Sequence, residues 1–408
     1  MGGSMTNFNR DTVLQRVPDL KIQIDSSNNI DIHFEGRIIQ CGVHGLGILD
    51  AFYQPTSVNE VLSKFQIRIK GIQDWMDFTT TILHLHNAGI LRDETQNKPE
   101  LGAKISGFEA APIHIAMLND KQRTLSYLKG IQEVVQPGDI VIDIGTGTGI
   151  LAIAAARAGA LHVYAIEASG IGKLAKAIFE DNGLSDRITL IGGWSTQVNL
   201  PEKADVLISE IIGNEPLGER VLETTMDAMK RLLKPNARLV PHKVKIFGLP
   251  VTIPFTEIVK HTLVAETLRD WQSWYDISFN PLAEASRNSS QPFYINPFLA
   301  RNWEPLSEPV QLAFVDLKGM SQLPIDSTVS AIANASGRLD GVLVYFEIEL
   351  GPTTRLSTHP AQAAKDCSWH SPVWILTEPL DLLTGDRFNV TYQYRVTEDQ
   401  FRVNVGRN

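Results

Sequence analysis

The sequence predicts an α/β doubly wound domain in the middle of the chain, with a small α+β domain before it and an antiparallel β domain after it. Three observations predict this order. Short alternating strands and then helical patterns open the chain, near-continuous apolar strands alternate with helices in the middle, and strand-like runs separated by turns follow Pro241. The length of 408 residues suits two or three domains. We therefore expect domains over 14–95, 104–240 and 241–408.

The first domain is expected to combine three short strands with three helices. Alternating apolar and polar residues between turns predict strands over Leu20–Asp25, Ile30–Phe34 and Arg37–Gln40. Ser57 caps the second helix, and Glu60 three residues later completes a capping box. Three strands followed by three helices are typical of a winged-helix-like domain.

Four near-continuous apolar runs predict the buried parallel strands of the middle domain. These runs are Ile140–Ile144, His162–Ile166, Ile188–Ile191 and Val206–Ser209. Helical patterns separate them, as in a Rossmann-like fold, in which ligands bind outside the carboxyl ends of the strands. Residues that follow these strands are therefore the candidates for chemistry.

Five strand-like runs with turns between them predict the last domain. These runs are Val244–Leu249, Val310–Val315, Gly341–Leu350, Val373–Leu376 and Phe388–Tyr394. Their number and spacing favour an antiparallel β-barrel. A helical insertion over about 254–280 interrupts the start of this domain.

The composition excludes several classes of protein. Apolar residues make up 43% and charged residues 20%, which excludes disordered, collagenous and coiled-coil chains. No apolar run is long enough to span a membrane, and no secretory signal opens the chain. With Cys41 and Cys367 as the only cysteines, we expect no zinc set and a cytoplasmic location. The formal charge of −9 argues against nucleic acid and for a cationic substrate.

A glycine-rich loop follows the first strand of the middle domain, in the sequence VIDIGTGTGI over 141–150. Gly145 and Gly147 allow positive φ and a close approach of the backbone to a ligand. Glu167 ends the next strand, where an acid can accept hydrogen bonds from two ribose hydroxyls. A glycine turn can also simply join a strand to a helix, but the pattern after Asp143 resembles motif I of class I S-adenosylmethionine (SAM) methyltransferases. This resemblance implies SAM as the cofactor.

A loop with several carboxylates follows the fourth strand, in the sequence SEIIGNEPLGE over 209–219. Acids on a loop are usually only solvated. At this place, however, Glu210 and Glu219 have the spacing of the double-glutamate loop of protein arginine methyltransferases, and the loop resembles it. Two carboxylates can bind a guanidinium bidentately and draw its charge away from the reacting nitrogen. No metal is needed for this chemistry.

Other motifs extend the resemblance discontinuously over residues 108–408. Residues 113–124 (IHIAMLNDKQRT) are similar to the family's helix before motif I, and 356–360 and 367–369 look like two of its later elements. The resemblance implies a SAM-dependent N-methyltransferase that acts on arginine side chains of a protein or a ribosomally made precursor peptide. It also implies that the helical insertion is an arm that makes a homodimer.

The resemblance further implies a role for each matching position. The expected cofactor-binding residues are His114, Arg123, Asp143, Gly145, Gly147, Glu167, Ser195 and Thr196. The expected catalytic residues are Glu210 and Glu219, and the expected substrate-binding residues are Met117, Asp120 and Trp369. His114 and Arg123 would lie at the methionyl carboxylate of SAM, Glu167 at the ribose, and Ser195 and Thr196 at the adenine.

Departures from the family pattern leave alternatives open. Ser368 stands where the family has a histidine that partners Asp120, and Ile212 stands where a methionine is frequent. The degree of methylation therefore stays open, and so does an acceptor other than arginine, such as a different side chain or a small molecule. A non-catalytic scaffold protein with the same fold is a further alternative.

The first domain resembles the PqqD-like peptide-recognition elements of peptide-modifying pathways. The resemblance is carried by its three strands, by 17–20 and 44–49, and by the helix that ends at 88–91. Such modules bind a leader peptide as an added strand beside the third strand and against the third helix. A leader-bearing precursor peptide is therefore the implied partner. The alternative is a winged-helix domain that packs on the catalytic part or binds DNA.

Overall fold

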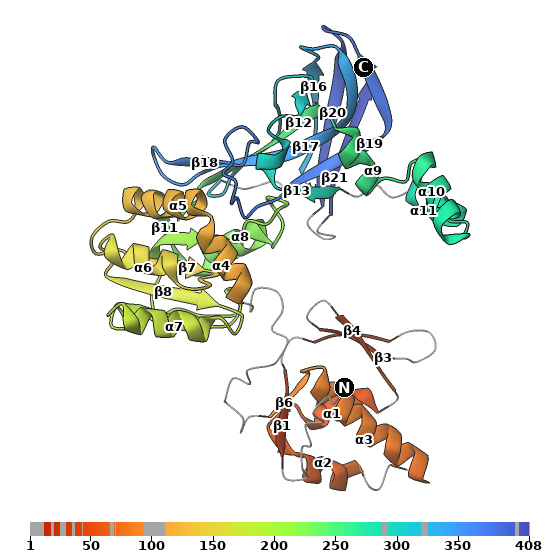
Figure 1. Cartoon of the computed structure of the whole chain (residues 1–408). Helices are drawn as coiled ribbons and strands as arrows, with labels where there is room; N and C mark the ends of the chain where they lie inside the picture. The colour runs from red at the N-terminus through yellow and green to blue at the C-terminus, as the bar shows by residue number, and fades with distance from the viewer. Residues whose placement is uncertain are drawn as a thin grey trace. The chain divides into compact units, whose positions relative to one another are not determined.

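A computed structural model shows two compact units, Met1–Lys104 and Ile105–Asn408 (Figure 1). The described residues are all of the chain except 1–11, 18–19, 25–29, 35–36, 43, 66–68, 70, 94–110, 288–291, 320–324, 396–399 and 408. Within these residues, no helix has both the length and the apolar composition that a membrane span requires.

The first unit contains the three predicted strands and three helices. The strands β2 (Lys21–Ile24), β3 (Ile30–Phe34) and β4 (Arg37–Cys41) form an antiparallel sheet in this order, and the helices are α1 (Gly45–Ala51), α2 (Val58–Phe65) and α3 (Gly71–Asn87). The amide of Glu60 donates to Ser57 Oγ over 3.2 Å, which confirms the predicted cap. A second sheet was not predicted, because it joins distant strands: β5 (Thr56–Ser57), β1 (Val13–Arg16) and β6 (Leu91–Asp93).

The second unit begins with a parallel sheet that confirms the four predicted strands. Its strands are β7 (Ile140–Ile144), β8 (His162–Glu167), β9 (Ile188–Gly192), β10 (Ala204–Ser209) and β11 (Leu233–Val240). The helices are α4 (Ala111–Asn119), α5 (Lys121–Val134), α6 (Ile150–Arg157), α7 (Gly172–Asp181) and α8 (Val221–Arg231). The strand order is β11-β10-β7-β8-β9, so chain order reverses between β7 and β10. An open α/β sheet binds its ligands at such a reversal.

The rest of this unit is an antiparallel β domain, as predicted. Its elements are β12 (Lys243–Thr252), β13 (Phe293–Ile295), β14 (Glu304–Pro305), β15 (Val310–Asp316), β16 (Ile325–Ile332), β17 (Gly337–Glu349), β18 (Arg355–Ser357), β19 (Ser371–Leu382), β20 (Arg387–Arg395) and β21 (Gln400–Arg407), with the 3-10 helix Pro297–Ala300. One sheet runs β13-β19-β17-β12-β14, with β15 on β12 and β18 on β17, and a second runs β16-β20-β21.

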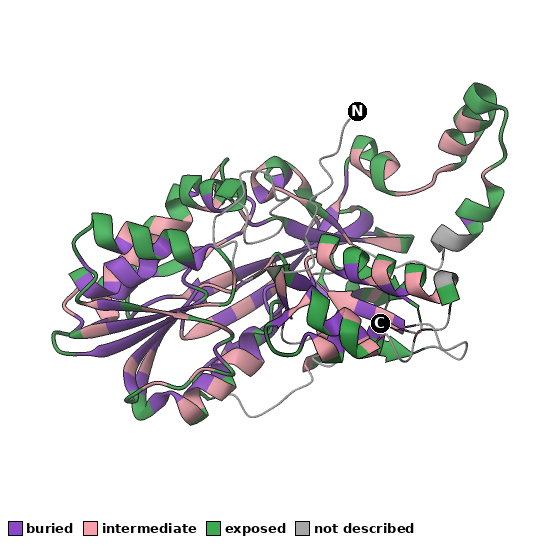
Figure 2. Ribbon diagram, turned by 90° about the horizontal axis from the view of Figure 1, so that it is seen from below, coloured by how far each residue is buried: buried purple, intermediate pink, exposed green. Residues whose placement is uncertain are grey.

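The predicted helical insertion lies between β12 and β13. It consists of α9 (Phe255–His261), α10 (Ala265–Tyr275) and α11 (Asn280–Arg287). No residue of α9 or α10 is buried (Figure 2).

Helix α5 packs closely against the β domain. A Cβ on Gly130 would lie 2.6 Å from the Cβ of Leu350, so only glycine fits at this crossing. At the end of the helix, the Glu133 carboxylate accepts hydrogen bonds from the amides and hydroxyls of Thr353 and Thr354, over 2.5–3.1 Å. These bonds lower the pKa of Glu133 to about 2, and the bond from the Thr353 hydroxyl contributes most. The helix is thereby shared by the parallel α/β part and the β domain.

Candidate active site

Many of the predicted site residues lie at or after the carboxyl ends of four adjacent strands, whereas His114 and Arg123 lie on α4 and α5 and Trp369 precedes β19. Along the order β10-β7-β8-β9 lie the glutamate loop, the glycine loop, Glu167 and the segment with Ser195. Backbone hydrogen bonds join neighbouring segments at this edge of the sheet. The amide of Gly145 donates to the carbonyl of Ile166 over 3.0 Å, and the amide of Gly193 donates to the carbonyl of Glu167 over 2.9 Å. The sheet therefore brings the predicted substrate end and the predicted adenine end to one edge.

The glycine loop leaves no room for side chains. Gly147 has φ of 55°, and a Cβ on it would lie 3.1 Å from the ring of the buried His114. A Cβ on Gly145 would lie 2.8 Å from Ile211. The bare backbone of this loop is thus available for close contact with a ligand.

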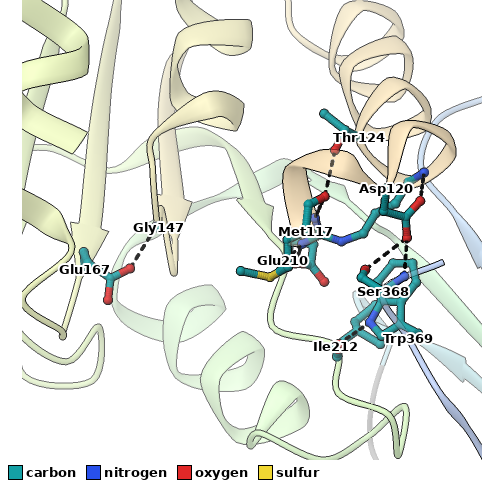
Figure 3. Close-up of polar contacts among 10 residues, drawn as sticks. Met117, Asp120, Thr124, Gly147, Glu167, Glu210, Ile212, Ser368 and Trp369 are labelled. Atoms are coloured by element: carbon teal, nitrogen blue, oxygen red, sulfur yellow. Dashed lines mark hydrogen bonds and ion pairs between the residues drawn. The ribbon is translucent and has the colours of Figure 1, made fainter. Parts of the chain in front are cut away.

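The carboxylate of Glu167 closes this loop. One oxygen accepts from the amide of Gly147 over 2.9 Å (Figure 3). The other accepts from the amide of Ser169 over 2.8 Å. Each carboxylate oxygen has a second lone pair, so Glu167 can accept from ligand hydroxyls as well. Ser195 is buried, and its carbonyl accepts from Arg231 over 2.7 Å, whereas Thr196 is exposed.

Three buried polar atoms on side chains that interact electrostatically have no hydrogen-bond partner among the described residues: Asp143 Oδ1, Arg123 Nε and Tyr127 Oη. They comprise an acceptor, a donor and a hydroxyl that can do both. This set suits the ammonium and carboxylate of the amino-acid end of SAM, so the residues present fit that cofactor. Sequence reasoning missed Tyr127, although its spacing of four residues from Arg123 places both on one face of α5.

Asp143 is fully buried at the end of β7. Its second oxygen accepts from the Thr146 hydroxyl over 2.5 Å. Burial raises the pKa of Asp143 to about 7, against the opposing effect of the Thr146 bond. A positively charged ligand beside this carboxyl group would favour its ionised form.

Arg123 joins the predicted cofactor side to the predicted substrate side. It forms an ion pair with Glu210, and the two side chains are only 12% and 10% exposed. Its guanidinium also donates to the carbonyl of Met117 over 3.3 Å and lies 5.3 Å from the ring centre of Trp369. Burial lowers the pKa of Arg123, but a guanidinium remains protonated in proteins.

Asp120 caps α5 and reaches the β domain. One carboxylate oxygen accepts from the amide of Arg123 over 3.0 Å. The other accepts from the amide of Ser368 over 2.8 Å and from its hydroxyl over 3.0 Å. In place of the histidine of the family pattern, Ser368 therefore supplies two donors (Figure 3).

The loop from Glu210 to Glu219 ends in a left-handed turn. Glu219 and Arg220 have φ of 57° and 61°, a conformation that costs energy for residues with a Cβ. The turn folds Glu219 back over the loop, since a Cβ on Gly213 would lie 3.1 Å from its carboxylate. Of the two predicted catalytic carboxylates, Glu210 is therefore nearly buried and Glu219 is exposed.

Within the described ranges, no group of three or more His, Cys, Asp or Glu side chains could hold a metal ion. The site combines a bare glycine loop, unsatisfied buried polar atoms and a carboxylate that binds a guanidinium. Such an arrangement can hold a zwitterionic nucleoside cofactor next to a cationic acceptor.

This chain is similar to several known proteins. A family model described as ribosomal protein L11 methyltransferase matches residues 121–241. The probable histone-arginine methyltransferase 1.4 of Arabidopsis thaliana is 32% identical over 279 residues, which are 66% of this chain and 52% of the relative. The chain therefore spans about half the length of that relative.

A solved structure and a second relative extend the match. The structure of the Trypanosoma brucei PRMT1 enzyme-prozyme heterotetrameric complex with AdoHcy has a TM-score of 0.63 at 24% identity, and covers 74% of this chain and 99% of that chain. The probable histone-arginine methyltransferase 1.3 of Arabidopsis thaliana is 30% identical over 395 residues, which are 89% of this chain and 72% of the relative. The chain belongs to the protein arginine methyltransferase family.

Proposed function

We propose that this chain transfers a methyl group from SAM to a guanidinium nitrogen of an arginine side chain in a protein or peptide. The observation that carries the proposal is the ion pair of Arg123 with Glu210. It shows a guanidinium held by a carboxylate of the glutamate loop, next to the ring of Trp369. A substrate arginine presents the same chemical group.

The residues of the loop suit a guanidinium acceptor. A protonated guanidinium is a poor nucleophile, because its nitrogen lone pairs are delocalised. Glu210 and Glu219 would bind its donors and pull its charge toward the nitrogens that do not react. When bound, SAM supplies an electrophilic methyl group on a sulfonium. Much of the rate would come from alignment, and a glutamate would accept the released proton.

The cofactor residues have distinct tasks in this proposal. Gly145 and Gly147 of the loop after β7 would line the methionyl end, Glu167 would hold the ribose, and Ser195 and Thr196 would border the adenine. His114, Arg123 and Asp143 would surround the methionyl end. Arg123 would then share its donors between Glu210 and the cofactor carboxylate, which its five N–H groups permit.

We further propose that the first unit recruits a leader-bearing precursor peptide. Strand β4 is at an edge of its sheet, where it pairs with β3. Ile38 on this strand is 60% exposed, and Met76 and Leu83 of α3 are 55% and 41% exposed. An extended peptide could add to the edge and place apolar side chains on these residues.

Homodimer formation through the arm is also part of the proposal. Trp274 and Tyr275 of α10 are 65% and 56% exposed. Large exposed aromatic side chains on helices without buried residues favour contact with a second copy. The free, buried thiols of Cys41 and Cys367 suit the cytoplasmic location that we propose.

The acceptor is tested with isotope-labelled SAM. The protein would be incubated with a peptide extract of its source cell and, separately, with free arginine, and the hydrolysed products would be analysed as amino acids. Label in methylarginine from the peptides supports the proposal, and the Glu210→Gln variant is the control. Label in another residue points to a different acceptor. Absence of label together with absence of SAM binding favours the scaffold alternative.

A further inference from the structure

Hydrogen bonds tie the glutamate loop to the β domain. The indole N–H of Trp369 donates to the carbonyl of Ile212 over 2.7 Å (Figure 3). The amide of His370 donates to the side chain of Asn214 over 2.7 Å. Further along the loop, the hydroxyl of Tyr394 donates to the carbonyl of Leu217 over 3.1 Å. The last of these bonds lies closest to the left-handed turn.

The turn needs an external support. Among the described residues with a side chain, only Glu219, Arg220 and Asp276 have positive φ. Such a conformation persists where the surrounding structure fixes it. The amide of Gly218 bonds to Glu215 O over 2.8 Å and closes the loop locally, but this bond lies within the loop itself. The hydroxyl of Tyr394 supplies an anchor from outside the loop.

We propose that Tyr394 is a positioning residue, which fixes the carbonyl of Leu217 and thereby holds the strained turn that aims Glu219 at the acceptor. The ring of Tyr394 is 1% exposed and stacks on Phe401 at 4.7 Å, so its hydroxyl has a defined place. This inference rests on the proposed function of Glu219. Tyr394 acts through Glu219 and has no assigned contact with the substrate.

Tyr392 provides a matched control on the same strand. It lies two residues before Tyr394, so both side chains are on one face of β20, and both are almost fully buried. Its hydroxyl has no hydrogen-bond partner in the described part of the chain. Tyr392→Phe and Tyr394→Phe therefore remove the same atom from similar surroundings, but only the second removes the anchor.

The first measurement is steady-state kinetics of the full chain with an arginine peptide. We expect Tyr394→Phe to lower kcat at least tenfold, with the Kd for S-adenosylhomocysteine within about twofold of the unmodified chain. Tyr392→Phe should change kcat less than twofold. Equal kcat values for the two variants would overturn the inference, as would a loss of cofactor affinity that accounts for the whole effect.

A second measurement does not depend on the reaction. Hydrogen–deuterium exchange of the peptide that covers residues 212–221 should be faster in Tyr394→Phe than in Tyr392→Phe, without any substrate. Unchanged exchange in Tyr394→Phe would overturn the inference, even if its activity fell. If the unmodified chain methylates no arginine, the proposed function fails, whereas the exchange result still decides whether Tyr394 holds the turn.

Discussion

The guanidinium of Arg123 and the carboxylate of Glu210 form an ion pair that spans the boundary between the predicted cofactor and substrate sites. Arg123 comes from α5, and Glu210 follows β10. Substitution of Glu210 therefore removes the charged partner of a predicted cofactor residue. Glu219 is exposed, and its negative charge favours the protonated form of Arg123.

The first prediction separates the two glutamates. Glu210→Gln and Glu219→Gln should each lower methyl transfer at least 100-fold while SAM binding stays nearly intact, because both carboxylates polarise the guanidinium. Glu210→Gln should also lower the free energy of unfolding by about 1–3 kcal/mol, since it leaves a buried cation with a neutral partner. Kinetics, SAM titration and thermal unfolding of both variants check this. Normal turnover in either variant would remove the arginine mechanism.

The second prediction concerns pH. Burial raises the pKa of Asp143 to about 7, while an unfolded aspartate loses its proton near pH 3.8. Between these values the folded chain binds a proton that the unfolded chain has lost, so the contribution of Asp143 to stability falls as pH rises. From about pH 5 to 8 this loss amounts to up to roughly 3 kcal/mol.

Urea unfolding at several pH values measures this effect. Asp143→Asn retains an oxygen for the Thr146 hydroxyl but cannot ionise. Between pH 5 and 8, its free energy of unfolding should therefore fall by up to roughly 3 kcal/mol less than that of the unmodified chain. The same pH dependence in both proteins would show that Asp143 ionises normally.

The third prediction uses the left-handed turn. Arg220 has φ of 61°, which costs about 1 kcal/mol for a residue with a Cβ. Arg220→Gly should therefore raise the free energy of unfolding by up to about 1 kcal/mol, the gain being limited by the entropy of glycine in the unfolded chain. Arg220→Ala keeps the Cβ and is the matched control. Thermal unfolding should show a higher free energy of unfolding in Arg220→Gly and no increase in Arg220→Ala, both relative to the unmodified chain.

The fourth prediction tests recruitment at the edge of the first unit. Ile38→Glu on β4 should raise the KM for a leader-bearing peptide at least tenfold, and leave the KM for a bare core peptide unchanged, because a charge disrupts apolar contacts with an added strand. Ile24→Glu on the opposite edge strand β2 is the control, since Ile24 is 54% exposed. If both substitutions act alike, or if both peptides respond alike, β4 is not the docking edge.

Local patterns explain which parts of the fold could be predicted. Continuous apolar runs predicted the strands β7 to β10. The glycines that follow β7 and the glutamates that follow β10 predicted the two loops of the site. The pairing of Arg123 with Glu210 could not be predicted, because 86 intervening residues separate them and only the assembled sheet brings them together. The anchor of Tyr394 on Leu217 depends in the same way on the docked β domain.

Helix α5 has a consequence for how the second unit unfolds. Gly130 crosses Leu350 with no room for a Cβ, Glu133 is bonded to two threonines of the β domain, and a single hydrophobic core contains both Ile131 and Leu350. The nucleotide-binding part and the β domain therefore share buried surface that neither could cover alone. Heating should melt them together as one cooperative transition, and a chain cut between 240 and 241 would yield two fragments with exposed apolar surface.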